Sequence, residues 1–268
     1  MSEALPHDLA VALDATVARR GAFGRTIFYH SEIGSTNDAA ARLAEAGAPE
    51  GTVVVAAAQT SGRGRLGRDW FSPPEAGLYV SIVCRERRAA PFLTLAGGVA
   101  VAEGIRAATS LPVEIKWPND VVVPASGLSR RRKIAGILAE ATSGTDGLQY
   151  VVLGFGINLR PAPYPSSIVD RASSLEAELG RPVDPGPVLA EALASFAECL
   201  ACLSQGESER VLTRWRELAP SATGSKVEYD GPSGRQAGIT AGIADDGALL
   251  VRSGEHVERV IAGELVWR

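Results

Sequence analysis

The spacing of apolar and polar positions along the chain predicts helices and strands that follow one another in mixed order. Apolar residues recur every three or four positions, as in helices that bury one face, at 8–20, 38–47, 92–109, 187–203 and 208–218. Continuous or alternating apolar runs predict strands at 26–30, 52–59, 77–84, 113–117, 133–142 and 149–158, with residues 145–147 as a hairpin turn between the last two. The larger part of the chain is therefore expected to contain both types of element.

Polar residues mark where the first two helices are expected to begin. Asp8 is a good N-cap for the helix at 8–20, and Gly21 is a typical residue just past its end. Ser35, Thr36 and Asn37 are all N-cap residues and precede the second helix. These three side chains could serve only as a cap, or they could present hydroxyl and amide groups to a neutral polar ligand.

The spacing changes from helical to strand-like near residues 220–224. Short strands are predicted at 226–230, 236–243 and 248–252 and within 257–268, around glycine-rich turns such as Asp246-Gly247. We therefore divide the chain into domains at 1–221 and 222–268 and predict a small β-barrel for the second. A barrel of roughly 45 residues is marginal alone, so it is expected to pack on the larger domain.

Composition places the chain among ordinary globular proteins. Its 268 residues are 46% hydrophobic and 22% charged, which excludes disorder, collagen and coiled coil. The net charge is −4, so the whole molecule has no electrostatic bias toward nucleic acid. Positive charge is nevertheless concentrated in two short runs, at 63–68 and 130–133. Of the second run, only Lys133 is expected to reach a site, because it adjoins an apolar strand.

The sequence favours a cytoplasmic protein. The first residues are acidic where a signal peptide would be basic, and no apolar run reaches the ~18 residues of a membrane span. Three cysteines do not suggest a disulfide framework. Cys199 and Cys202 have the spacing of a redox or zinc motif, but they lie in a helical pattern without a second ligand pair, which favours buried apolar thiols.

The glycine–arginine loop at 62–68 matches the pattern G-x-G-x-x-G of dinucleotide-binding folds. That pattern must open a helix, whereas Pro73 and Pro74 follow here, so a dinucleotide site is not predicted. Glycines permit close approach to a ligand, and arginines supply planar donors for carboxylate or phosphate. We expect residues 62–70 to form a loop that is disordered without a ligand and becomes ordered around an anion. A solvated basic loop and a nucleic-acid patch are the alternatives.

Several polar residues lie at the ends of predicted strands, where binding sites of such folds tend to lie. Residues 116–120 (KWPND) end one strand and could equally be a simple turn. Lys133 adjoins an apolar strand and requires an anionic partner if it is drawn inward. Gln59 closes a buried strand and needs a hydrogen-bond partner. The glycines of 154–158 (GFGIN) permit close backbone approach, and Asn158 offers both donor and acceptor.

Taken in order, these segments resemble the motifs of the biotin protein ligase family. The resemblance extends over about residues 25–268, and its motifs are Ser35-Thr36-Asn37, Gln59, 62–68 with Trp70, 116–120, 133–140 (KIAGILAE) and 154–158. It implies an α+β fold with a class II synthetase-like mixed β-sheet flanked by helices, followed by a small C-terminal SH3-like β-barrel. It also implies the monofunctional type, which has no DNA-binding domain.

The resemblance assigns a role to each matching residue. Biotin would be bound by Ser35, Thr36, Asn37, Gln59, Arg63, Gly64, Arg65 and Lys133. ATP would be bound by Arg65, Arg68, Trp70, Asn119, Asp120, Lys133 and Asn158, with Trp70 near the adenine and Asp120 orienting a neighbour or linked to Mg²⁺. Lys133 and Arg65 would be the catalytic residues, and the protein itself would supply no dedicated metal site. Leu66 departs from the family, in which some relatives carry a further basic residue.

The implied activity is ATP-dependent ligation of biotin to one lysine of a biotin carboxyl carrier protein, such as that of acetyl-CoA carboxylase, through biotinyl-5′-AMP. ATP and Mg²⁺ would be required, and neither nucleic acid nor a membrane is an expected partner. A lipoate or other acyl ligase on the same scaffold is the nearest alternative. A module that binds nucleic acid or anions without catalysis, and a biotin-sensing repressor, are the others.

Overall fold

A computed structural model describes the chain except for residues 1, 125–130, 232–233, 262, 264 and 268. Its main body is a seven-stranded sheet in the order β1-β2-β3-β7-β6-β5-β4. These strands are β1 (Ile27–His30), β2 (Val53–Ala56), β3 (Gly77–Cys84), β4 (Glu114–Lys116), β5 (Asp120–Val123), β6 (Arg132–Gly144) and β7 (Gly147–Asn158). β1 and β2 are parallel and the other neighbours antiparallel, so the predicted mixed sheet is confirmed.

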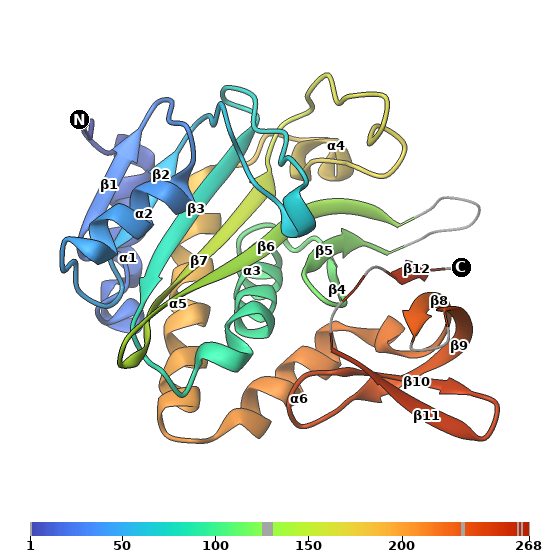
Figure 1. The fold of residues 1–268 in the computed structure, drawn as a ribbon. Coiled ribbons are helices and arrows are strands. Elements are labelled where there is room, and N and C mark those ends of the chain that lie inside the picture. Colours follow the sequence, from blue (N-terminus) through green and yellow to red (C-terminus); the bar gives the residue numbers. More distant parts are fainter. Residues whose placement is uncertain (1, 125–130, 232–233, 262, 264, 268) are drawn as a thin grey trace.

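Helices cover the two faces of this sheet unequally (Figure 1). The helices are α1 (His7–Arg20), α2 (Thr36–Glu45), α3 (Leu93–Thr109), α4 (Leu175–Leu179), α5 (Pro185–Ser204) and α6 (Ser208–Leu218). α3 and α5 lie behind the sheet as Figure 1 shows it, with α1 against α5, and their apolar residues join Val55, Ile82 and Ile137 in the main core. On the opposite face α2 packs over Val54 and Val152, and the rest of that face is left for other contacts.

Small residues let α3 approach its neighbours closely, as its composition predicts. A Cβ on Gly97 would lie 3.0 Å from Ile137 and 3.1 Å from Leu153 of the sheet. A Cβ on Gly104 would lie 2.6 Å from the backbone nitrogen of Ala192 in α5. Larger residues here would force the helices off the sheet, because close-packed interiors do not absorb extra methyl groups without strain.

Two segments, Arg87–Thr109 and Pro185–Ser204, are long and apolar enough to cross a membrane by length and composition. The expectation that no run reaches that length is therefore wrong. Of their most apolar windows, 67% and 78% of the residues are buried inside the protein. Their apolar character is accounted for by the core that they form with the sheet.

The structure corrects some element boundaries. Pro6, not Asp8, occupies the N-cap position of α1, and Ser35 occupies that of α2 without a capping hydrogen bond from its side chain. α2 ends at Glu45 rather than at Gly47, which follows with a positive φ of 87°. β5 and α4 were not predicted, because each is short and follows turn-forming residues.

The C-terminal part is a five-stranded antiparallel sheet in the order β11-β10-β9-β8-β12. Its strands are β8 (Thr223–Gly231), β9 (Gly234–Ile243), β10 (Leu249–Ser253), β11 (His256–Val260) and β12 (Leu265–Trp267). Contact with the larger sheet includes a hydrogen bond of 3.1 Å from Trp117 Nε1 to the carbonyl oxygen of Gly247. The hairpin of β10 and β11 extends away from the main body, whereas β12 lies close to β4 (Figure 1).

Candidate active site

A cavity of about 900 Å³ lies over the face of the large sheet that α3 and α5 do not cover. Its walls come from the start of α2, the loop after β2, the β4–β5 turn, strands β6 and β7, and the C-terminal strand β12. The structure brings all of the site residues predicted from the sequence to this cavity: Ser35, Thr36, Asn37, Gln59, Arg63, Gly64, Arg65, Arg68, Trp70, Asn119, Asp120, Lys133 and Asn158.

Residues 62–70 form a short hairpin, which we call the flap. The backbone nitrogen of Trp70 donates to the Gly62 carbonyl at 2.9 Å, and that of Gly64 donates to the Arg68 carbonyl at 2.7 Å. A single turn at Arg65–Gly67 forms the tip, where Leu66 has a positive φ of 58° and is 70% exposed. After the flap, the next regular element in the described chain is the strand β3 and not a helix, which agrees with the rejection of a dinucleotide-binding loop.

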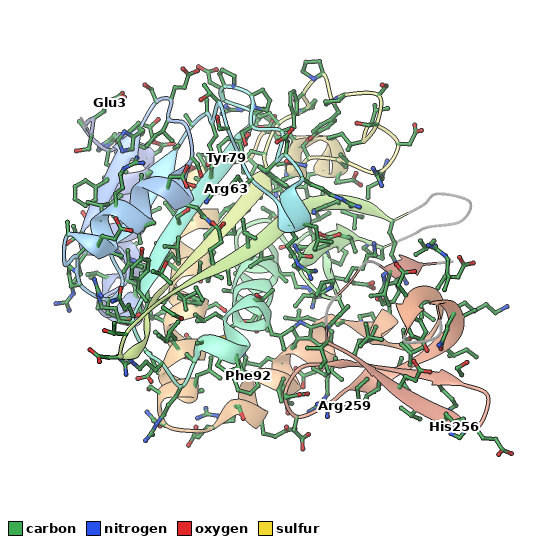
Figure 2. All side chains as sticks on the ribbon, viewed as in Figure 1. Glu3, Arg63, Tyr79, Phe92, His256 and Arg259 are labelled. Atoms are coloured by element: carbon green, nitrogen blue, oxygen red, sulfur yellow. The ribbon has the colours of Figure 1, made fainter. Side chains whose placement is uncertain are left out.

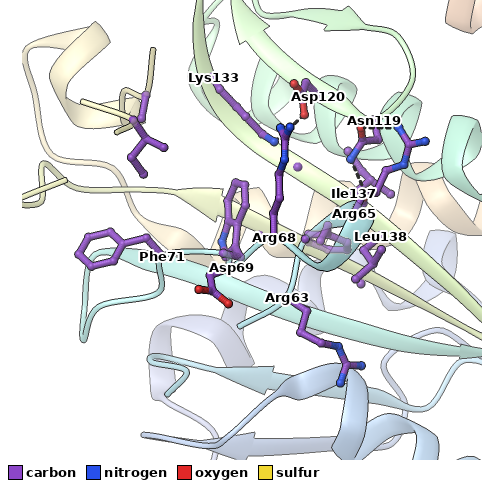
Figure 3. Close-up of a pocket in the computed structure, with 18 of the residues that line it drawn as sticks. Arg63, Arg65, Arg68, Asp69, Phe71, Asn119, Asp120, Lys133, Ile137 and Leu138 are labelled. Atoms are coloured by element: carbon purple, nitrogen blue, oxygen red, sulfur yellow. Dashed lines mark hydrogen bonds and ion pairs between the residues drawn. The ribbon is translucent and has the colours of Figure 1, made fainter. Parts of the chain in front are cut away.

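The three arginines of the flap extend in two directions, Arg63 toward α2 and β6 and the other two toward the β4–β5 turn (Figure 3). Arg63 forms ion pairs with Asp38 of α2 and with Glu140 of β6. Arg65 donates to Asn119 Oδ1 at 3.3 Å, and burial lowers the pKa of its guanidinium although Asp120 partly offsets this. Arg68 points toward Asp120 in Figure 3. The flap therefore holds positive charge over the middle of the cavity.

One end of the cavity is lined by neutral hydrogen-bonding groups, and we call it the neutral end. Thr36 donates to Gln59 Oε1 from its backbone nitrogen at 2.9 Å and from its hydroxyl at 3.0 Å. Gln59 Nε2 in turn donates to Ser72 at 3.0 Å, so the predicted need of Gln59 for partners is confirmed. Ser35 Oγ is buried and has no hydrogen-bond partner among the described residues, which leaves this hydroxyl for a ligand.

The opposite end, the cationic end, is lined by Lys116, Arg131, Lys133 and Arg171. Lys133 Nζ lies 2.5 Å from Asp120 Oδ1, so its predicted anionic partner is confirmed. Burial lowers the pKa of Lys116, an effect that Asp120 opposes and the neighbouring cations reinforce. An anion bound here would relieve the mutual repulsion of these groups.

Arg131 also lines the cavity, so the expectation that only Lys133 of the run at 130–133 reaches the site is wrong. Arg132 turns away and pairs with Glu178 at 2.8 Å, and Arg130 lies outside the described residues. The position of Arg131 could have been inferred from Lys133, because residues two positions apart in extended backbone face the same side. Arg131 lies just before β6 and two positions from Lys133.

Trp70 lies against two glycines of the sheet. Gly136 of β6 and Gly156 of β7 are direct partners in the strand pairing, and neither has a side chain to separate the indole from the strands. A Cβ at Gly136 would lie 2.9 Å from Trp70, and one at Gly156 would overlap Trp70 Nε1. Lys133 Nζ lies 4.9 Å from the centre of the indole ring. These glycines therefore admit Trp70, where the sequence had suggested direct approach of a ligand.

Asn119 and Asp120 occupy the tight turn between β4 and β5, with Asp120 the first residue of β5 rather than the end of a strand. Asn119 Nδ2 donates to the carbonyl of Ile137 at 2.8 Å, and the Ile137 nitrogen donates back to the Asn119 carbonyl at 2.9 Å. Asn158 is held similarly, since its Nδ2 donates to the Ser173 carbonyl at 2.8 Å. Both amides thus have fixed orientations, with Asn119 Oδ1 accepting from Arg65 and Asn158 Oδ1 left for other contacts.

Comparison with known proteins bears directly on this site. The Biotin/lipoate A/B protein ligase family matches residues 30–158. A bifunctional ligase/repressor BirA of Bacillus subtilis is 32% identical over 90% of this chain and 74% of its own length. The biotin–[acetyl-CoA-carboxylase] ligase of Paracoccus denitrificans is 32% identical over 86% of this chain and 96% of its own length.

A biotin protein ligase from Aquifex aeolicus, solved in complex with biotin and ATP, has the same fold. It superposes with a TM-score of 0.76 at 29% identity, over 91% of this chain and 99% of that one. The chain belongs to the biotin protein ligase family. The fold and the order of the site motifs thus agree with the resemblance seen in the sequence.

In this biotin protein ligase several cavity residues had not been predicted from the sequence. They are Lys116, Arg131, Tyr164, Arg171 and Trp267, together with Ser81 and Glu140 beside the neutral end. Lys116 and Glu140 lie inside recognised motifs, but nothing in their spacing indicated a role. Ser81 had a signal, because it is a single polar position in the wholly buried strand β3. Trp267 had none, because only folding brings β12 to the cavity.

The cysteines lie away from the cavity. Cys84 and Cys199 are buried and Cys202 is partly buried, and all three are free thiols. Burial raises the pKa of the Cys199 thiol to about 12, which keeps it protonated and unreactive. Among the described residues, no group of three or more histidine, cysteine, aspartate or glutamate side chains could hold a metal ion. The buried-thiol interpretation of Cys199 therefore accords with its surroundings.

Proposed function

We propose that this protein joins biotin to a lysine of a biotin carboxyl carrier protein, such as that of acetyl-CoA carboxylase, in an ATP-dependent reaction through biotinyl-5′-AMP. One observation carries the proposal: a single cavity has a neutral end with ordered hydroxyl and amide groups, and a cationic end. Biotin has a neutral polar ring at one end and a carboxylate at the other. The neutral end suits the ring, and the cationic end suits the carboxylate together with a triphosphate.

In the first step the biotin carboxylate attacks the α-phosphate of ATP, a P–O bond forms, and pyrophosphate leaves. Two anions must meet, and Lys133 and Arg65, which both line the cavity, offset their repulsion. Asp120 holds Lys133 Nζ at 2.5 Å, and Asn119 holds Arg65, so both cations are positioned before a ligand arrives. Positioning of this kind is favourable because it avoids reorganisation during the reaction.

Mg²⁺ is expected to enter with ATP. Asp120 lines the cavity beside Lys133, and a carboxylate in that place fits an ion held mainly by nucleotide phosphates and water. The donor set therefore suits such an ion, whose charge would help to neutralise the phosphates. Asp120 would keep Lys133 and Arg68 directed toward the same region (Figure 3).

In the second step the amine of the acceptor lysine attacks the carbonyl carbon of the adenylate, an amide bond forms, and AMP leaves. The mixed anhydride is prone to hydrolysis, so water must be excluded until the acceptor arrives. The flap covers the middle of the cavity and is suited to this task. Tyr164 is not a candidate base, because burial raises the pKa of its hydroxyl to about 12.

The test is incubation of the protein with MgATP, a biotin carrier domain and either biotin or lipoate. We expect one biotinyl addition to one lysine by mass spectrometry, and release of pyrophosphate with biotin but not with lipoate. Equal turnover of lipoate would favour the alternative acyl ligase. Salt-dependent binding of oligonucleotides without pyrophosphate release would favour a nucleic-acid module instead.

Arg65→Gly is expected to weaken retention of the adenylate. Loss of one charge-assisted contact corresponds to roughly 10- to 150-fold faster escape of biotinyl-5′-AMP. The adenylate that remains bound to the enzyme after rapid gel filtration measures this, and biotin label on a bystander protein provides a second readout. Retention equal to that of the unmodified protein would contradict the assignment.

Trp267→Leu is expected to weaken ATP binding while leaving biotin binding unchanged. Lys116 Nζ and the Arg131 guanidinium lie 5.9 Å and 5.8 Å from the Trp267 ring centre, so the indole positions two cations of the cationic end. Loss of these cation–π contacts corresponds to about a 2- to 30-fold rise in the KM for ATP. A rise in the KM for biotin of the same size would show a general structural effect instead.

Two further proposals concern the rest of the chain. The five-stranded C-terminal sheet is proposed to be an SH3-like barrel, and the main domain a class II synthetase-like one; the strand order and the position of β8 just after residue 222 support this division. The protein is proposed to act in the cytoplasm, which the three free cysteines support.

A further inference from the structure

Glu140 of β6 lies outside the set of residues assigned to biotin or ATP, yet it joins two parts of the site. Its Oε2 accepts a hydrogen bond of 2.6 Å from Asn37 Nδ2 and one of 2.7 Å from the Arg63 guanidinium. Asn37 belongs to the neutral end, whereas Arg63 lies at the base of the flap. A single carboxylate oxygen thus holds both.

A chain of hydrogen bonds continues from Asn37 through the neutral end. Asn37 Oδ1 and Thr36 Oγ1 both lie within hydrogen-bond distance of Ser81 Oγ, at 2.5 Å and 2.8 Å. Gln59 accepts from Thr36 and donates to Ser72. Every link in this chain is either buried or partly buried from solvent.

Ser72 returns this chain to the flap, because its hydroxyl donates to the Trp70 carbonyl at 3.0 Å. The flap is therefore fixed to the neutral end at both of its bases. Gln59 and Ser72 hold the base at Trp70, and Glu140 holds the base at Arg63. Of these connections, the one between Glu140 and Arg63 joins two charged side chains.

We propose that Glu140 is a positioning residue that couples occupancy of the neutral end to closure of the flap. The inference rests on the proposed function, since biotin is the ligand taken to fill the neutral end. The carboxylate fixes which way the Asn37 amide points, because it accepts only from Nδ2 and cannot bond Oδ1. A ligand that orders Asn37 thereby orders Glu140, and Glu140 orders Arg63.

The neighbouring acid provides a matched comparison. Asp38 also pairs with Arg63, but within the part of the chain that the structure describes its side chain makes no hydrogen bond to Asn37. The side chains of Arg63, Asp38 and Glu140 are 40%, 45% and 41% exposed, so the two ion pairs are similarly solvated. Removing either charge should loosen the flap, but only removal of the Glu140 charge should also weaken its link to Asn37.

The experiment compares Glu140→Gln, Asp38→Asn and the unmodified protein by limited trypsin digestion at the flap arginines, with and without saturating biotin. Biotin binding is measured separately by calorimetry, so the digestion does not depend on turnover. We expect biotin to protect the flap of the unmodified protein and of Asp38→Asn by similar factors. In Glu140→Gln, protection by biotin should fall by roughly 2- to 5-fold even though biotin is bound.

Steady-state kinetics add a second readout. Glu140→Gln should raise the KM for biotin more than the KM for ATP, and Glu140→Asp should restore part of the protection. Protection in Glu140→Gln equal to that of the unmodified protein overturns the coupling, as does an equal loss in Asp38→Asn. A wild-type protein that binds and ligates biotin without protection of its flap overturns the coupling alone. Failure of the wild-type protein to bind biotin overturns the proposed function and the coupling with it.

Discussion

Lys133→Ala is expected to slow formation of the adenylate by about 100- to 1,000-fold, which is the usual cost of removing one positioned donor from developing negative charge. Lys133 Nζ lies between Asp120, at 2.5 Å, and the Trp70 ring, with its centre at 4.9 Å, so it is held at the cationic end without a ligand. The measurement is pyrophosphate release with biotin and MgATP in the absence of a carrier protein. Unchanged release would contradict the role of Lys133.

Arg132→Ala is the matched control for Lys133→Ala. Arg132 is the preceding residue of β6, but it is exposed and pairs with Glu178 on the other side of the strand. Its removal also deletes one positive charge, so the net charge of the two variants is the same. We expect pyrophosphate release by Arg132→Ala within about twofold of the unmodified protein, because Arg132 does not line the cavity and pairs with Glu178 instead.

The second large effect is expected for Gly156→Ala, which adds a single methyl group beneath the flap. The new Cβ would overlap Trp70 Nε1 and lie 2.7 Å from Trp70 Cε2, so the indole must leave the sheet. Overpacking of this size corresponds to roughly a 5- to 150-fold loss of binding, and we expect it as a higher KM for ATP. Trp70 is exposed enough to move, so the fold should be retained, as thermal unfolding would show.

Gly98→Ala controls for the methyl group itself. A Cβ at Gly98 would meet Ile115 at 3.6 Å, which is ordinary van der Waals contact, and Gly98 lies within α3 rather than beside the cavity. Alanine favours a helix over glycine, so this variant should be as stable as the unmodified protein or more so. If the KM for ATP of Gly156→Ala equalled that of Gly98→Ala, the position of the Trp70 indole above Gly156 would not matter for ATP binding.

The regular elements of the fold were predicted well where their patterns are long. The predicted strand at 77–84 and helix at 208–218 have the observed bounds, because β3 is apolar except at Ser81 and α6 buries one face. β5 was missed because its four residues follow a proline turn that hides the start of a strand. The parallel pairing of β1 with β2 was also beyond sequence reasoning, since only tertiary packing decides which strands meet.

The candidate site was predicted to the extent that its residues lie in short ordered motifs. Those motifs named thirteen of the residues that line the cavity, but they did not reveal contacts between residues far apart in the chain. Glu140 meets Asn37 across 103 positions, and Trp267 reaches Lys116 from the end of the chain. The glycines of β7 were recognised as positions of close approach, yet the sequence could not tell that Trp70 and Asn37 occupy the space.

The seating of Trp70 also gives the protein an optical reporter of its own. Its indole nitrogen is shielded from water above Gly156, and an indole that moves from such a place into solvent emits at longer wavelength. The chain has four tryptophans, of which Trp117 and Trp215 are 3% and 0% exposed and so contribute a nearly constant background, and the Trp267→Leu variant removes the fourth. Opening and closing of the flap can therefore be followed by intrinsic fluorescence in stopped-flow experiments, without a dye or a label.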